Sequence, residues 1–191
     1  MRRDWPQLAR AKARGVKFGS EISLFMHLCP APIVGITGSS GKTTTTTLVG
    51  KILGQKRKVY VGGNIGQPLI GQLEKIQPDE LVGLELSSFQ LQDLQVSPKF
   101  SSILNITPNH LDLHSSMEEY SEAKYKIVRY QEHGDWAVLN LDDPASWQAR
   151  EKTSAQICPF SLKQELSEGA YLHGDELIWR FAGQQEVVCK T

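Results

Sequence analysis

Cysteine is scarce in this chain, and the three cysteines lie far apart, at positions 29, 158 and 189. An odd number without CxxC spacing excludes a disulfide framework and a cysteine-based zinc site. Long apolar runs are also missing, since none approaches the roughly 20 residues of a membrane-spanning helix. The first residues lack the apolar stretch of a secretory signal. We therefore expect a cytoplasmic protein that does not insert into a membrane.

An excess of charge of either sign is absent as well, because 21 Lys and Arg balance 21 Asp and Glu. This balance gives no electrostatic reason to expect nucleic-acid binding. What is present is an ordinary globular composition, with 40% hydrophobic and 22% charged residues. A length of 191 residues allows one full domain with a piece of a second. The expected state is a monomer.

The first 31 residues predict a helix, a short strand and a second helix. Pro6 suits the first turn of the first helix, Gly15 its end, and Ser20 can cap the second helix. Two prolines then interrupt the pattern at positions 30 and 32. We interpret residues 1–31 as the tail of a truncated domain and residues 32–191 as a second domain, itself incomplete at its C-terminal end.

From residue 33 onward, short apolar runs alternate with helical stretches. The expected strands are 33–37, 59–61, 81–86, 102–106 and 136–141, and the expected helices are 42–53, 68–76, 89–94 and 117–131. Continuously apolar short strands are typical of a parallel sheet that is buried on both faces. The alternation predicts an α/β fold with a doubly wound, mostly parallel sheet, extended by a β-hairpin over 169–181. Ligands bind such sheets at the carboxyl ends of the strands.

A glycine-rich loop follows the first of these strands. Gly38, Ser39, Ser40 and Gly41 lead into Lys42, Thr43 and Thr44, which open a helix. A loop between strand and helix presents backbone N–H groups to an anion, Lys42 adds a charge for the β- and γ-phosphates, and the Thr43 hydroxyl suits Mg²⁺. The spacing is the short GxxGKT form, and the sequence predicts a P-loop that binds ATP.

Three more motifs fall near the ends of later strands: GGNIG at 62–66, ELSSFQL at 85–91 and NITPNHLD at 105–112. Together with TGSSGKT at 37–43 they resemble the Mur ligase family. The GGNIG and ELSSFQL forms are similar to the branch that adds D-glutamate, whereas folylpolyglutamate synthases share the loop but differ in these two motifs. The resemblance implies ATP and Mg²⁺ as cofactors, and UDP-N-acetylmuramoyl-L-alanine and D-glutamate as substrates in peptidoglycan precursor synthesis. It also implies an acyl-phosphate intermediate.

The resemblance assigns roles to individual residues. Lys42, His110 and Lys124 would be catalytic, Thr43, Glu85, His110 and a carbamylated Lys124 would hold metal, and Asn64 and Ser87 would contact substrate. Each residue also fits an ordinary structural role: Glu85 a solvated charge or helix cap, and His110 a hydrogen-bonded histidine. Asp112 could orient His110 or cap a turn. Asn109 and Leu113 depart from the family pattern, which puts support for the metal ligands in doubt.

Lys124 has a physical argument beside the resemblance. Ser115 or Ser116 can begin a helix with a capping box, and Tyr120, Lys124, Ile127 and Val128 then share one face. A lysine among apolar neighbours either extends its head into water or is buried with a lowered pKa, which leaves an amine able to react with CO₂. Both alternatives stay open here.

Two other function classes compete with a ligase. A general P-loop kinase or NTPase would explain the loop but not ELSSFQL or Lys124. A non-catalytic nucleotide-binding module would fit a chain with only a remnant of the family's UDP-substrate domain and without its C-terminal domain. We expect the 191-residue chain alone to be inactive.

Overall fold

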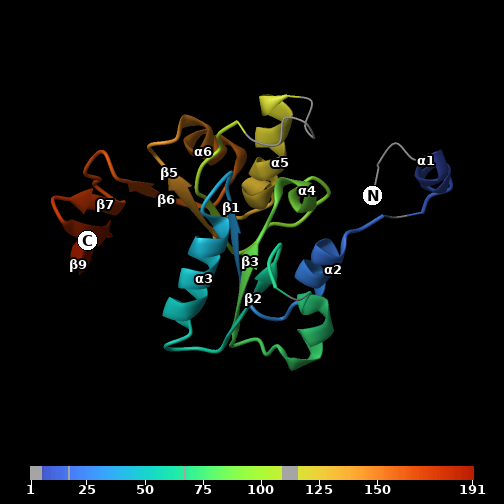
Figure 1. Ribbon diagram of the computed structural model, residues 1–191, viewed down its shortest axis with the longest axis horizontal. Helices are drawn as coiled ribbons and strands as arrows, with labels where there is room; N and C mark the ends of the chain where they lie inside the picture. Colours follow the sequence, from blue (N-terminus) through green and yellow to red (C-terminus); the bar gives the residue numbers. More distant parts are fainter. Residues whose placement is uncertain (1–5, 17, 67, 109–115) are drawn as a thin grey trace.

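The computed structural model of the chain describes residues 6–16, 18–66, 68–108 and 116–191. Two short helices come first, strands β1 to β6 then alternate with helices, and β7, β8 and β9 follow in succession (Figure 1). The helices are α1 (Pro6–Ala13), α2 (Glu21–Leu28), α3 (Lys42–Leu53), α4 (Ser88–Leu91), α5 (Met117–Arg129) and α6 (Pro144–Gln148), with 3₁₀ helices η1 (Leu69–Lys75) and η2 (Ala149–Lys152). The strands are β1 (Ile33–Thr37), β2 (Val59–Gly63), β3 (Leu81–Glu85), β4 (Phe100–Ile103), β5 (Trp136–Asn140), β6 (Gln156–Ser161), β7 (Gly169–His173), β8 (Glu176–Phe181) and β9 (Gln184–Lys190).

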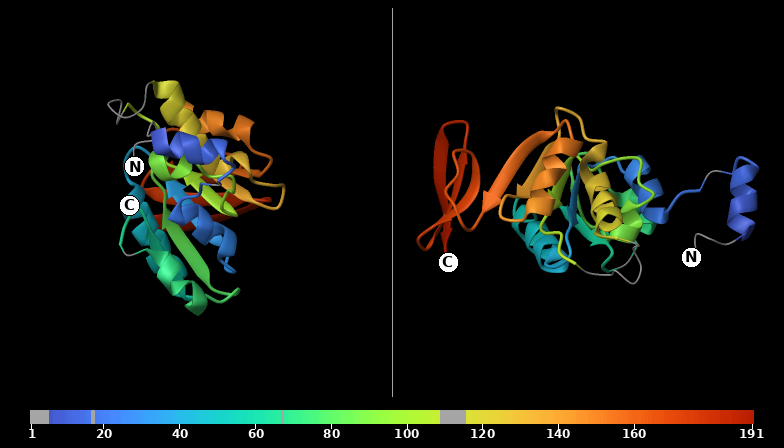
Figure 2. Two further views of the ribbon diagram at one scale, coloured as in Figure 1. Left: turned by 90° about the vertical axis from the view of Figure 1, so that its right-hand side faces the viewer. Right: turned by 90° about the horizontal axis from the view of Figure 1, so that it is seen from above.

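Within the described residues the strands form one sheet in the order β2-β3-β1-β4-β5-β6-β7-β8-β9. The pairs from β2 to β7 are parallel, and only β7–β8 and β8–β9 are antiparallel. The predicted doubly wound, mostly parallel sheet with a hairpin near the C-terminus is therefore confirmed. Figure 2 shows α1 and the β7–β9 strands extending from opposite sides of the central sheet.

Helices cover both faces of the parallel sheet. Gly83 lies opposite Val34 in the register and faces Thr46 of α3. One residue along, Gly35 lies beside Leu84 and faces Pro98 on the other side. The main core fills that second face, with buried side chains from α2, β3, α4, α5 and β5. The alternation explains why the central strands β1 and β3 read as continuously apolar, because both are buried on two faces.

Several boundaries differ from the prediction. The strand expected over 102–106 ends at Ile103, because residues 104–107 instead bond to neighbouring loops. The segment 68–76 forms a 3₁₀ helix. The short strand expected between the first two helices is not found among the described residues there, which leave out position 17. β6, β9 and α6 were not predicted. Among the described residues, no helix has the length and apolar character needed to cross a bilayer.

Candidate active site

The P-loop joins β1 to α3 at the carboxyl edge of the sheet. Gly41 is the N-cap of α3 with φ 79°, a left-handed conformation that glycine adopts without strain. Gly38 allows close packing, since a Cβ there would lie 3.1 Å from the Cβ of Leu104. Helix α3 spans the predicted residues 42–53, although five threonines favour it little. Its first amides have no partner within the helix and remain available for an anion.

Two lysines converge on one carbonyl of this loop. The Nζ atoms of Lys42 and Lys124 each lie 3.0 Å from the oxygen of Gly38 and donate to it. Lys124 is 1% exposed, and its ammonium lies 4.6 Å from the ring centroid of Tyr120. Burial, and secondarily the charge of Lys42, lower the pKa of Lys124 to about 7. The buried alternative for Lys124 therefore holds, and near neutral pH part of the population carries a neutral amine.

The helix that carries Lys124 forms as predicted. Ser116 caps α5 by accepting from the amide of Glu119, which selects the second of the two capping registers. Tyr120 and Ile127 are buried on the same face as Lys124. The Tyr120 hydroxyl lies 3.1 Å from Oγ of Ser39, so this face also contacts the P-loop.

A second cluster centres on Glu85, which ends β3 and is 2% exposed. Its Oε2 accepts from the hydroxyl of Thr43 at 2.6 Å, and its Oε1 accepts from the side-chain amide of Asn64 at 3.0 Å. Gly63 makes this approach possible, because at φ 99° a Cβ there would lie 2.2 Å from the carbonyl oxygen of Glu85. The glycines of GGNIG thus bring Asn64 onto the carboxylate.

The remaining predicted site residues are not seen in either of these two clusters. Ser87 caps α4 in a capping box with Gln90, a structural contact that does not test a role toward substrate. Thr44 lies exposed in the first turn of α3. His110, Asp112, Asn109 and Leu113 lie outside the described residues, and so does Ser115. No group of three or more His, Cys, Asp or Glu in metal-binding proximity occurs in the part of the chain that the structure describes.

The residues around Thr43 nevertheless fit Mg²⁺. The Thr43 hydroxyl and the buried Glu85 carboxylate lie side by side next to the loop. When Mg²⁺ binds nucleotide phosphates, the protein usually supplies only one or two oxygen ligands of this kind. Thr43 and Glu85 would hold the ion, which would neutralise phosphate charge.

Sequence reasoning missed three residues that support this edge. Asn105 follows β4, Asn140 ends β5, and Asp143 caps α6. Asn105 bonds the P-loop, whereas Asn140 and Asp143 bond the segment that contains Asn105. Their position at or just after the carboxyl ends of parallel strands was the signal that could have found them.

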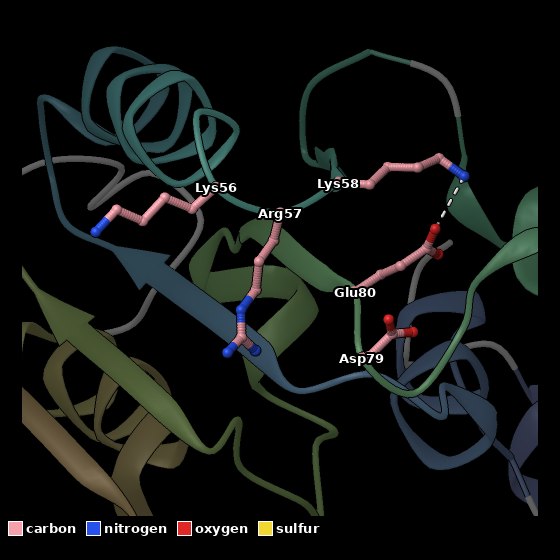
Figure 3. Close-up of a pocket in the computed structure, with 5 residues that line it drawn as sticks. All are labelled: Lys56, Arg57, Lys58, Asp79 and Glu80. Carbon is pink, nitrogen blue, oxygen red and sulfur yellow. Dashed lines mark ion pairs between the residues drawn. The ribbon is translucent and has the colours of Figure 1, made fainter.

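A cavity also lies away from the carboxyl edge. A cavity of about 420 Å³ lies at the opposite edge, lined by Lys56, Arg57, Lys58, Asp79 and Glu80. Figure 3 shows Lys58 reaching Glu80, with Lys56 and Arg57 on the adjoining turn after α3. All five belong to turns or the entries of strands, and none was predicted to act in catalysis.

Comparison with known proteins decides the family. Residues 36–189 match the model described as the Mur ligase middle domain. The chain belongs to the Mur ligase family. It is 46% identical over 183 residues to the UDP-N-acetylmuramoylalanine–D-glutamate ligase of Symbiobacterium thermophilum, a match that covers 94% of this chain and 40% of that protein. The chain thus spans about two fifths of the length of this Mur ligase relative.

Solved Mur ligases share the fold. MurF from Acinetobacter baumannii superposes with a TM-score of 0.63 at 20% identity, over 85% of this chain and 38% of that one. MurF from Thermotoga maritima, solved in complex with ADP, gives 0.57 at 24% identity over 90% and 40% of the two chains. At these identities the likeness establishes the architecture of the Mur ligase middle domain, and the chemistry is argued from the residues.

Proposed function

We propose that this chain is the ATP-binding middle region of an ATP-dependent ligase that adds D-glutamate to UDP-N-acetylmuramoyl-L-alanine. The single observation that carries the proposal is convergence at one sheet edge: Lys42 and Lys124 meet at Gly38, and Thr43 meets Glu85 beside them. The name of the relative from S. thermophilum supports the choice of acceptor and donor. ADP in the related T. maritima ligase supports an adenine nucleotide.

The reaction needs an activated carboxylate, because a free carboxylate is a poor electrophile. Transfer of the γ-phosphoryl group of ATP to the carboxylate of UDP-N-acetylmuramoyl-L-alanine gives an acyl phosphate and ADP. The amine of D-glutamate then attacks the acyl carbon, phosphate leaves, and the amide remains. Positioning and charge neutralisation supply most of the catalysis in such phosphoryl transfers.

Each site residue has a separate role in this reaction. Lys42 neutralises the β- and γ-phosphates, and the first amides of α3 orient them. Thr43 and Glu85 would hold Mg²⁺, His110 would be a further ligand, and the ion would neutralise phosphate charge. Asn64 fixes the Glu85 carboxylate, and Asn64 and Ser87 would contact substrate. The neutral Lys124 amine would add to CO₂ and release a proton to solvent, and the resulting carbamate would be able to hold a second Mg²⁺.

The test is D-glutamate-dependent release of ADP, measured on a version extended to the full length of the relatives. Its Lys42→Ala and Lys124→Ala variants should lose nearly all turnover, and labelled bicarbonate should give a carbamate ¹³C signal that Lys124→Ala abolishes. The 191-residue chain alone should make no amide product. ADP release by the extended protein that ignores D-glutamate would favour a general P-loop NTPase instead.

A further inference from the structure

The segment that follows β4 faces two different loops. Leu104 and Ile106 bond toward the end of β5: the Leu104 oxygen accepts from the Asn140 side-chain amide at 2.8 Å, and the Ile106 amide donates to Oδ2 of Asp143 at 3.2 Å. Asn105 and Thr107, which alternate with them, bond toward the P-loop. Alternation of this kind is expected of extended backbone, whose successive residues point in opposite directions.

Asn105 holds the P-loop by both its main chain and its side chain. Its carbonyl oxygen accepts from the amide of Ser39 at 2.9 Å. Its Oδ1 accepts from the amide of Ser40 at 2.9 Å, and its Nδ2 donates to the oxygen of Ser40 at 3.2 Å. The side chain therefore pairs with Ser40 as a strand would, and both amides at the start of the loop point toward residue 105.

Thr107 adds a second attachment two residues further. Ser39 Oγ donates to the Thr107 oxygen at 3.0 Å and accepts from the Thr107 amide at 2.9 Å. This pairing runs through the side chain of Ser39, whereas Asn105 acts on main-chain groups. Only Asn105 among these residues therefore fixes the backbone direction of the loop immediately before Gly41.

The β5 end fixes Asn105 in turn. Asp143 uses Oδ1 to cap α6 through the Ser146 amide and Oδ2 to hold the Ile106 amide. Asn140 uses Oδ1 to accept from the Asp142 amide while Nδ2 holds Leu104. Each of these two side chains therefore joins the segment that contains Asn105 to the residues after β5.

We propose that Asn105 is a positioning residue that holds the P-loop in the conformation that receives phosphate. The proposal rests on the proposed function, since it takes this loop to be the phosphate site. With the Ser39 and Ser40 amides committed to Asn105, the loop turns at Gly41 and leaves the first amides of α3 for the anion. Without the Asn105 side chain, a loop of glycine and serine has to be ordered when the ligand binds, and that ordering weakens binding.

The experiment compares three variants of the full chain. Asn105→Ala removes all three side-chain bonds to Ser40, which involve its amide, its hydroxyl and its carbonyl oxygen. Asn105→Asp keeps an acceptor for the Ser40 amide but loses the donor. Ser97→Ala is the matched control, because Ser97 also makes two hydrogen bonds to main chain, with the Lys126 oxygen and the Tyr130 amide, far from the loop. Hydrogen exchange of the Ser40 amide by NMR and the Kd for pyrophosphate and Mg-ATP are measured for each.

Asn105→Ala should speed exchange of the Ser40 amide and weaken pyrophosphate binding about 10-fold, the effect of losing about two ordinary hydrogen bonds. Asn105→Asp should restore protection of that amide, which a general loss of stability would not do. Ser97→Ala should change neither quantity. Should Asn105→Ala fail to fold, Asn105→Ser carries the same test, because one hydroxyl cannot replace both groups of the amide.

Two results would contradict the proposal, and they differ. If the unchanged chain binds neither pyrophosphate nor Mg-ATP, the proposed function fails at its phosphate site and the positioning role fails with it. If the unchanged chain binds and Asn105→Ala binds equally well, or Ser97→Ala weakens binding as much, only the positioning role of Asn105 is wrong.

Discussion

The two edges of the parallel sheet use charged side chains in opposite ways. At the carboxyl edge Glu85 and Lys124 are almost fully buried, and each has a fixed partner. At the amino edge a cavity of about 420 Å³ is lined by charged residues, and its ion pair joins Glu80 to a Lys58 side chain that is 61% exposed. At the carboxyl edge burial itself lowers the pKa of Lys124, whereas at the amino edge the pKa of Glu80 is lowered by hydrogen bonds made at the surface. This difference in burial, rather than the presence of a cavity, identifies the site.

The largest effect that we expect from a substitution at either sheet edge is a loss of folding stability at the carboxyl edge. Gly63→Ala places a Cβ 2.2 Å from the Glu85 carbonyl oxygen and forces φ 99° on an L-residue. We expect a loss of about 3 kcal/mol in the free energy of unfolding. Gly134→Ala is the control at the amino entry to β5, where nothing lies within 4 Å of the added Cβ. Urea unfolding measures both, and equal midpoints for the two variants would show that the close approach to Glu85 is not needed.

A second test compares one lysine at each edge. Lys42→Ala should raise the Kd for Mg-ATP or pyrophosphate about 10- to 100-fold, the range expected for a lost hydrogen bond to a charged group. Lys56→Ala, at the cavity of the amino edge, should leave that Kd unchanged. Calorimetry or NMR titration measures both. If the Lys56 variant weakens binding and the Lys42 variant does not, the phosphate site has been assigned to the wrong edge.

The sequence could predict those parts of the site whose residues lie close together along the chain. The P-loop and α3 were found with the correct bounds because glycines, lysine and threonine follow one another along the chain. The buried face around Lys124 was found because helical spacing is also local. By contrast, the contacts of Glu85 with Thr43 and Asn64 join residues 42 and 21 positions apart. They depend on strand order, which periodicity does not reveal.

The missed strands have their own physical reasons. β6 contains Pro159, which usually argues against a strand, yet the main chain pairs with β5 on one side and β7 on the other. β9 is exposed at all seven residues, so it lacks the apolar alternation that marks a half-buried strand. Its partner β8 supplies the order instead. In both cases tertiary pairing overrides the local preference.

A third prediction uses the buried amine of Lys124. Its pKa falls to about 7 in the folded chain against an ordinary value of 10.5. Between these values the unfolded chain binds one more proton, so the free energy of unfolding should rise with pH, by at most about 1.4 kcal/mol per pH unit. Below pH 7 both states are protonated and this gain is absent. Lys124→Met should remove the rise between pH 7 and 9.5. An equal slope in both proteins would show that Lys124 stays charged.

The smallest effect is expected from the ion pair of the amino edge. The Gln77 amide, with help from Lys58, lowers the pKa of the Glu80 carboxyl below its ordinary value of 4.5. Its contribution to stability is therefore present above pH 4.5 and lost as the pH falls through the lowered folded value. Because the pair is open to solvent, water and salt screen it, and such pairs contribute little.

Glu80→Gln should consequently shift the unfolding midpoint at pH 7 only slightly, and the shift should shrink further in high salt and vanish near pH 2. Lys58→Met tests the same pair from its exposed end and should give a still smaller shift, since the Gln77 amide continues to hold Glu80. Neither variant should alter the Kd for pyrophosphate. A salt-independent loss as large as that of Gly63→Ala would mean that the amino edge is as firmly built as the carboxyl edge, and the contrast between the two edges would no longer hold.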